Sequence, residues 1–496
     1  MLTLIRKHKI TTVKRLVILT GLFLMGYSLS AQFAEDALRF SELYRQGTAR
    51  SMAIGGAFGG LGGDFSVLST NPGGLAIYRS SELSASPEIF TRETTSIYNG
   101  QQREDSRTIF DFANLGWISA KSLGRGAKGW KYYQLAFGMN RLNNFNSNQY
   151  MQGPNQDNSR LDVYRAKANG TPYTDLESGY FPDDLTPAWY MYLLDTLPGT
   201  TDQYYTPVPY AGTLQTQRIN TKGSINEFLF SGAANFDDVL YLGASVGMPY
   251  IRYFRESFYS ETDVADTIPD FESWTTSEYL ETFGFGINFK LGAIVRPVDW
   301  IRIGVAFHTP TWYFSMRDTW HINMSSDLEW FSGDTIMPVR TYKYKLTTPL
   351  RAIGSLGFVI KKIGFISLEY EYTNYGWAKL NARDYGFGNE NANIKNYYQS
   401  THNFRAGTEW RISKISLRAG YALYGSPYKD DLNDGMRQSF SGGIGFRMDN
   451  FSVDFAYVYS VKNEDYYLYS YGDIQSNAVN NAFTDQNFVF TFRYFY

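Results

Sequence analysis

Histidine and cysteine, the residues best suited to acid–base and metal chemistry, are scarce in this 496-residue sequence. Cysteine is absent, which excludes disulfides and thiolate metal sites. Beyond the first thirty residues only His308, His321 and His402 remain. An enzyme or a metal centre would need a histidine beside a nucleophile, an acid or a second ligand, and the sequence shows no such pattern. We therefore predict no catalytic residue, no metal site and no cofactor.

Two arginines are the candidates for binding an acidic ligand. Arg405 and Arg418 fall on the water-facing sides of two strands predicted below. If the turn Ile412–Lys414 is tight, Glu409 lies diagonally across from Arg418, within reach of its side chain. Each arginine could bind a ligand carboxylate. The alternative is a network of ion pairs that holds a polar wall together, and both interpretations stay open here.

A third candidate is a run of apolar side chains inside a long polar segment, residues 142–222. Trp189, Tyr190 and Leu193 lie in a short helix-like stretch after Pro187. An exposed aromatic and aliphatic patch of this kind often marks a ligand site. The alternative is a loop that packs on its own core.

Strands must position these residues, because apolar and polar side chains alternate from Ser81 to the C-terminus. Aromatic residues make up 17% of the chain and glycines number 45, yet the mean hydropathy is −0.33. This composition is typical of strands with one face in lipid and the other in water. We predict an all-β fold, a transmembrane antiparallel β-barrel of about 14 strands. The predicted strands are 81–98, 109–120, 131–141, 223–236, 239–252, 278–296, 300–317, 342–360, 363–377, 397–411, 415–424, 438–448, 451–460 and 485–496.

The connections between these strands alternate between short turns and long polar loops. Outer-membrane barrels have short periplasmic turns opposite long extracellular loops, whereas a soluble β-sandwich has no reason to keep this order. Trp117, Trp130, Trp300 and Trp410 lie beside the short turns, where they would form one interfacial belt. The last strand carries aromatic residues on one face and ends on Tyr496, a termination common in closing strands.

The N-terminus reads as an export signal. Basic residues precede the apolar stretch Leu16–Tyr27, and small residues follow it, as in a secretory signal peptide. We assign the signal peptide to residues 1–31. Its removal takes away basic residues only, so the mature chain is more acidic than the formal charge of −2, which argues against a nucleic-acid partner.

Between the signal and the first strand lies a glycine-rich segment that resembles a known family. It resembles the N-terminal hatch of the FadL/TodX family of outer-membrane transport proteins, in its Bacteroidetes-type form. Where that family usually has Asn-Pro-Ala, this chain has Asn71, Pro72 and Gly73, the hatch residues of the motif. The resemblance rests on residues 47–52, the glycines of 55–63, residues 64–72 and 75–82, and the later segments 289–310 and 348–375.

The resemblance implies a hatch at 32–80 that plugs a barrel at 81–496, whose largest extracellular loop is 142–222. It implies a channel in the outer membrane of a Gram-negative bacterium for hydrophobic small molecules, such as long-chain fatty acids, with a lateral exit through the wall. Expected partners are outer-membrane lipid, the hydrophobic ligand and the barrel-assembly machinery. Two alternatives remain: a barrel that serves as a structural partner or shuttle in protein secretion, and a haemin receptor in which His308 takes part. A general porin conflicts with a plugged lumen.

Overall fold

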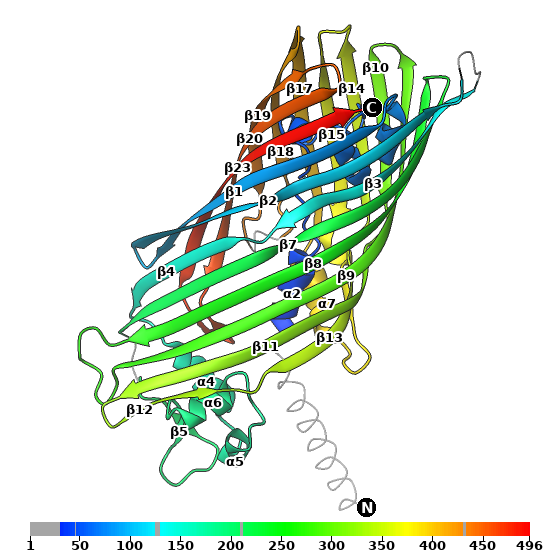
Figure 1. Ribbon diagram of the computed structural model, residues 1–496. Coiled ribbons are helices and arrows are strands. Elements are labelled where there is room, and N and C mark those ends of the chain that lie inside the picture. The colour runs from blue at the N-terminus through cyan, green and yellow to red at the C-terminus, as the bar shows by residue number, and fades with distance from the viewer. Residues whose placement is uncertain (1–29, 45, 125–128, 209–211, 430–432) are drawn as a thin grey trace, which may run out of the picture.

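The computed structural model describes residues 30–44, 46–124, 129–208, 212–429 and 433–496 (Figure 1). In these residues one antiparallel sheet closes into a barrel, because β1 (Glu82–Tyr98) pairs both with β2 (Gln101–Ser122) and with β23 (Ala478–Phe495). The barrel has 14 strand positions, which confirms the predicted fold class. The other positions are filled in chain order by β3 (Trp130–Asn144), β7 (Thr213–Phe236), β8 (Leu240–Thr262), β9 (Ser273–Val298), β10 with β11 (Ile301–His308, Trp312–Leu328), β13 with β14 (Arg340–Thr347, Arg351–Ile360), β15 (Gly364–Asn374), β17 (Ser400–Ile412), β18 (Ile415–Tyr424), β19 (Arg437–Arg447) and β20 (Phe451–Tyr467). The signal peptide predicted at 1–31 lies outside the described residues, apart from Ser30 and Ala31.

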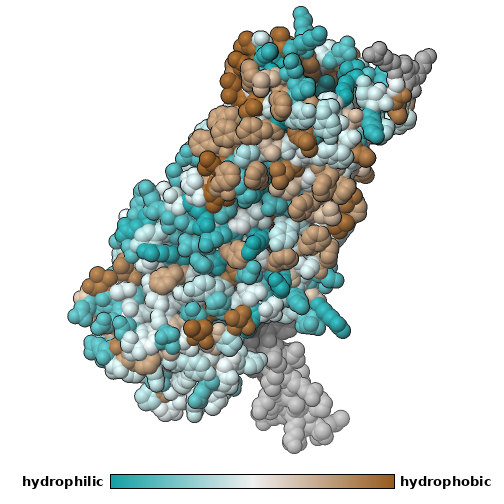
Figure 2. Space-filling view, viewed as in Figure 1, coloured by the Kyte–Doolittle hydropathy of each residue, from teal (hydrophilic) through white to brown (hydrophobic). Residues whose placement is uncertain are grey.

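The wall shows the predicted alternation. In β23, Phe488, Phe490 and Phe492 are exposed on the outer face, whereas Val489 and Thr491 between them are buried. Successive side chains of a strand point to opposite faces, so an apolar outer face and a mixed inner face suit a wall between lipid and a filled lumen. On the face shown in Figure 2, apolar side chains gather over the half of the barrel that carries the short turns.

The two ends of the barrel differ. At one end the turns are tight, with left-handed backbone at Asp237, Asp238 and Lys361 (φ 50°, 58° and 48°). At the other end the strands run on into long loops (Figure 1). The four tryptophans predicted to form a belt, Trp117, Trp130, Trp300 and Trp410, are exposed beside the tight turns. By the rule for outer-membrane barrels, this end faces the periplasm.

Two predicted strands are each broken in two. The segments 300–317 and 342–360 are interrupted near Pro310 and Pro349, because a proline has no N–H to donate to the ladder. Both β10 and β11 pair with β9, while β14 pairs with β10 and β13 with β11. Each broken strand therefore still fills one position in the wall.

The first hairpin also departs from the prediction. Residues 99–108 were expected to form a connection, but β2 already begins at Gln101. The turn is Asn99–Gly100, with φ of 45° and 79°, the backbone of a type I′ hairpin turn. The predicted alternation of short and long connections therefore fails at this hairpin.

The predicted loop 142–222 is shorter and folded. Its first residues extend β3 and form β4 (Ser147–Asn155), and its last residues belong to β7. Between them, residues 156–208 form a compact cap beyond the extracellular end of the strands (Figure 1). The cap contains α4 (Arg160–Ala168), α5 (Tyr173–Glu177), α6 (Leu185–Tyr190), β5 (Asp195–Thr196) and β6 (Tyr204–Tyr205). The remaining elements of the loops are β12 (Phe331–Ile336), η3 (Tyr375–Trp377), β16 (Lys379–Asn381), α7 (Gly388–Tyr397), β21 (Ser470–Tyr471) and β22 (Ile474–Gln475).

The described part of the N-terminal segment lies inside the barrel, and we call residues 30–44 and 46–78 the plug. It comprises α2 (Ser30–Arg39), α3 (Ala49–Met52), η1 (Phe65–Ser69) and η2 (Pro72–Ile77), with α2 beside α7 (Figure 1). Ile54, Phe58 and Leu75 form a buried core with side chains of the wall. Among the described residues, no helix has both the length and the apolar character needed to cross a membrane.

Candidate functional site

The predicted hatch residues fix the plug to the wall. Asn71 begins η2, and its Oδ1 accepts a hydrogen bond from the N–H of Gly73 at 3.1 Å. Its Nδ2 donates to the carbonyl of Gly59 at 2.6 Å and to that of Ala293 on β9 at 3.1 Å. One fully buried amide therefore caps a helix, braces the plug and binds the wall at the same time.

Gly73 stands where the family usually has alanine, and the wall explains the glycine. A Cβ on Gly73 would lie 3.0 Å from Cα and N of Ala293. The wall is equally bare there: a Cβ on Gly292 would lie 2.0 Å from Asn71 Oδ1, and one on Gly243 would lie 2.1 Å from the carbonyl oxygen of Pro72. Plug and wall thus meet backbone to backbone, which only glycine allows at this distance.

Other wall glycines receive side chains of the plug. The ring of Phe65 occupies the space above Gly116 and Gly138, 2.3 and 2.5 Å from where their Cβ atoms would lie. Ile54 fills the space above Gly407 with its carbonyl oxygen and Cβ, and its backbone fills the space above Gly420. These wall glycines that make room for the plug were not predicted from the sequence. The signal was present as inward-facing glycines in strands that otherwise alternate regularly.

A chain of ion pairs joins the plug to four strands. Arg50 Nε lies 2.8 Å from Glu409 Oε2, and Arg418 Nε lies 2.7 Å from the same oxygen. Arg418 also binds Asp454 at 2.7 Å, and Asp454 binds Arg493 at 2.6 Å. Glu409 and Arg418 are direct cross-strand partners, not diagonal ones as predicted. The structure thus places Arg418 in the ion-pair network that was the alternative to carboxylate binding.

Arg405 has the same kind of environment. Its guanidinium binds Glu369 at 3.0 Å and Glu371 at 3.2 Å and lies over the ring of Tyr424. All three charged side chains are buried. Two carboxylates already surround this arginine, so the arrangement favours a structural ion-pair network over a site for a further carboxylate.

The structure does not bring the predicted ligand residues of the cap together as an exposed patch. Leu193 is 0% exposed and belongs to the core of the cap, and Trp189 packs against that core and stacks on Tyr173. Tyr190 remains 40% exposed, and its hydroxyl donates to the carbonyl of Glu177 at 2.8 Å. The expectation of a patch is wrong for Leu193, because the loop packs on its own core.

The three histidines have separate environments. His308 is buried, and its Nε2 lies 2.6 Å from the carbonyl oxygen of Thr70, so it contacts the plug. His321 stacks on Tyr279, and Nδ1 of His402 lies 2.7 Å from the hydroxyl of Tyr370. Within the described ranges, no three His, Cys, Asp or Glu residues are grouped so as to hold a metal ion.

One stretch of the wall lacks a backbone ladder. β2 pairs with β3 only from Asn114 to Ser122, and β4 pairs with β7. Residues 101–113 of β2 therefore face residues 141–155 of β3 and β4 through side chains, such as Arg103 with Gln152 at 2.8 Å. We call this boundary the seam. Sequence reasoning missed it, although the polar run on both faces of 101–107 sets this strand apart.

The end of the seam nearest the periplasm lies between the outer face of the wall and an apolar cluster in the lumen. Outside, Phe110 is 68% exposed and packs against Phe112. Inside, Phe145 packs edge-on against Phe40 of the plug and Tyr253 of β8, with ring centroids 5.8 and 5.3 Å apart. Arg141 holds this corner closed by ion pairs with Glu88 and Asp111. An apolar cluster of the lumen therefore lies next to a stretch of wall without a backbone ladder.

Comparisons with known proteins agree with this architecture. A family model described as outer membrane protein transport protein (OMPP1/FadL/TodX) matches residues 210–490, more than half of the chain. The crystal structure of a Pseudomonas aeruginosa FadL homologue is 12% identical with a TM-score of 0.53, over 92% of this chain and 99% of that one.

Two further solved structures are similar. The Pseudomonas putida toluene transporter TodX is 11% identical with a TM-score of 0.53, covering 91% of this chain and 99% of that one. The CymD monoaromatic hydrocarbon channel is 12% identical with a TM-score of 0.50, covering 90% and 97%. At this identity the likeness concerns the fold alone. No curated protein sequence matches the chain.

Proposed function

The chain belongs to the outer membrane protein transport protein family (OMPP1/FadL/TodX), and on that premise we propose that it admits long-chain fatty acids or similar lipophiles and releases them sideways through the seam. The family is one of channels for hydrophobic compounds in the outer membrane. The observation that carries the lateral exit is the missing ladder between β2 and β3–β4, beside the cluster of Phe40, Phe145 and Tyr253.

Energetics favour the seam as the place where the wall opens. In lipid, each backbone group that loses its partner costs several kcal/mol, so parting two laddered strands over several residues is prohibitive. At the seam, residues of β2 and β4 part with the loss of side-chain contacts only, such as Arg103 with Gln152. Exposed side-chain pairs of this kind contribute about 0–1 kcal/mol each.

The capture of the ligand follows from burial of apolar surface. An apolar ligand gains about 25 cal/mol for each Å² removed from water, which suffices for binding from dilute solution. The arginines of the lumen are enclosed by carboxylates, as at Arg405 with Glu369 and Glu371. We therefore propose selection by apolar character, so that acids and neutral hydrocarbons compete for the same path.

A reversible disulfide cross-link tests the lateral exit. Because the chain has no native cysteine, the two introduced cysteines can pair only with each other within one molecule. Asp105 and Asn148 contact each other across the seam, with Asn148 Nδ2 3.5 Å from Asp105 Oδ1. The oxidised double variant Asp105→Cys, Asn148→Cys should admit little fluorescent fatty acid into liposomes, and reduction should restore uptake.

The matched control locks the neighbouring ladder and leaves the seam free. Thr91 and Thr108 are direct partners on β1 and β2, with hydroxyls 2.9 Å apart. The oxidised variant Thr91→Cys, Thr108→Cys should transport like the wild type. Undiminished uptake through the cross-linked seam would refute the lateral exit. If the wild type admits neither a fatty acid nor a hydrocarbon, the channel proposal itself fails.

A further inference from the structure

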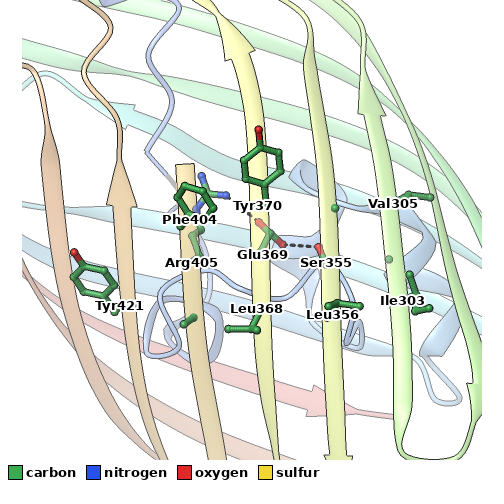
Figure 3. Close-up of a pocket in the computed structure, with 13 residues that line it drawn as sticks. Ile303, Val305, Ser355, Leu356, Leu368, Glu369, Tyr370, Phe404, Arg405 and Tyr421 are labelled. Atoms are coloured by element: carbon green, nitrogen blue, oxygen red, sulfur yellow. Dashed lines mark hydrogen bonds and ion pairs between the residues drawn. The ribbon is translucent and has the colours of Figure 1, made fainter. Parts of the chain in front are cut away.

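A groove crosses the outer face of the wall, on the side formed by β10, β14, β15, β17 and β18 (Figure 3). Its volume is about 470 Å³. Leu368 and Tyr370 of β15 line it, with Phe404 beside Tyr370 and Leu356 beside Leu368 (Figure 3). These side chains belong to the outward-facing, exposed set of their strands, so the groove opens toward lipid and not toward the lumen.

The groove exists because the residue at its centre has no side chain. Gly354 stands between Val305 and Tyr370 in register, and a Cβ built on it meets no atom within 4 Å. Ala406, the cross-strand partner of Leu368, leaves a second low point. Large side chains around two small ones thus form the groove.

The groove lies at the height of one leaflet of the membrane. Leu356 and Gly354 lie four and six residues from Ile360, where β14 ends at the periplasmic turn. With a rise of about 3.3 Å per residue and a tilt of about 40°, they lie roughly 10–15 Å above the turn. Half of the hydrocarbon core is about 15 Å thick, so the groove spans the acyl region of the periplasmic leaflet.

Two of the turns below the groove are basic. Lys361 and Lys362 form the β14–β15 turn, and Lys414 lies in the β17–β18 turn. All three are exposed, and the two turns are joined by a hydrogen bond from Arg411 N to the carbonyl of Ile363 at 2.7 Å. The β7–β8 turn by contrast carries Asp237 and Asp238. The β9–β10 turn at the edge of the groove carries the exposed Asp299, and Lys121 and Lys131 beside the β2–β3 connection are also basic. Three exposed lysines therefore lie beneath the part of the groove formed by β14, β15, β17 and β18.

We propose that this face binds one anionic phospholipid of the periplasmic leaflet, with an acyl chain in the groove over Gly354 and the phosphate against Lys361, Lys362 and Lys414. The proposal does not rest on the transport function, because the groove lies outside the lumen. Lipid tails gain no hydrophobic free energy by leaving other lipids, so affinity must come from shape and charge. Each basic residue near the surface favours an anionic headgroup by about fivefold.

A filled groove tests the site. Gly354→Phe should occupy the channel without a clash, because nothing lies near the new Cβ. The matched control is Gly232→Phe on β7, an outward glycine whose nearest neighbour to a Cβ is Leu135 at 3.7 Å and which lies above the acidic turn. Both variants should keep the faster gel mobility of an unboiled barrel.

The readout is native mass spectrometry in mild detergent with added phosphatidylglycerol. Wild type and Gly232→Phe should retain one phosphatidylglycerol, and Gly354→Phe should retain at least tenfold less. A triple variant should abolish the preference for phosphatidylglycerol over uncharged diacylglycerol; it combines Lys361→Gln, Lys362→Gln and Lys414→Gln. Equal retention by the two phenylalanine variants would overturn the groove site. Absence of a headgroup preference in the wild type would overturn the phosphate site, and a wild type that binds no lipid would overturn both.

Discussion

The contact between the plug and β9 yields the sharpest prediction, for the substitution Gly292→Ala. The new Cβ would lie 2.0 Å from Asn71 Oδ1 and 2.8 Å from Pro72 Cδ, so Asn71 must leave its position. Loss of a helix cap costs about 1 kcal/mol. Overpacking against a rigid strand adds about 1–3 kcal/mol. Together, about 2–4 kcal/mol should raise the population of an unseated plug roughly 30- to 700-fold.

The assay is the frequency of ion-conducting openings in planar bilayers. Gly442→Ala is the control, because this glycine faces outward on β19 and its Cβ would lie 3.7 Å from the nearest atom, the carbonyl oxygen of Arg418. Gly292→Ala should open far more often than Gly442→Ala, while both assemble as heat-modifiable barrels. Equal opening frequencies would refute the argument that close backbone contact at Asn71–Gly73 holds the plug.

Two further predictions concern buried residues that had been candidates for ligand binding. Arg405→Ala leaves the buried Glu369 without its cation and Glu371 with Arg351 alone, and it should lower stability against urea by about 3–5 kcal/mol, with equal loss of uptake for a fatty acid and a hydrocarbon. Selective loss of fatty-acid uptake would contradict the structural role. Leu193→Ser should destabilise the core of the cap by about 2–5 kcal/mol and make residues 156–208 sensitive to limited proteolysis. Tyr190→Ser, at a half-exposed site, should leave the digestion pattern nearly unchanged.

The wall could be predicted from sequence because its physics is local. Alternation such as Phe488–Val489–Phe490 reports which side chain meets lipid, and this pattern needs no knowledge of neighbouring strands. The tight turns and the tryptophans beside them also indicate which end of the barrel faces the periplasm. Two mistakes were also local: Pro310 and Pro349 carry the known signal for a strand break, and Asn99–Gly100 is the strongest short hairpin signal.

The site could not be predicted to the same extent, because it depends on which residues meet across the lumen. The sequence shows only that Gly73 departs from the Asn-Pro-Ala of the family, and the close approach of Ala293 shows why a Cβ would be crowded there. Arg50 lies 359 positions from Glu409, its partner. Composition alone does not reveal whether Leu193 faces solvent or a core, since both suit an aromatic and aliphatic run.

The position of Thr491 has a consequence for the order of assembly. Its hydroxyl accepts a hydrogen bond from Ala49 N of the plug at 2.7 Å and lies 2.8 Å from the hydroxyl of Ser86 on β1. The last strand of the ring thus contacts the first strand and the plug through one hydroxyl, although Ala49 and Thr491 are 442 positions apart. Until β23 pairs with it, β1 keeps one edge unpaired, and such an edge invites pairing with foreign chains. The pairing that removes this edge also brings Thr491 to the position where it binds the plug, so closure of the ring and attachment of the plug at Ala49 depend on the same residue.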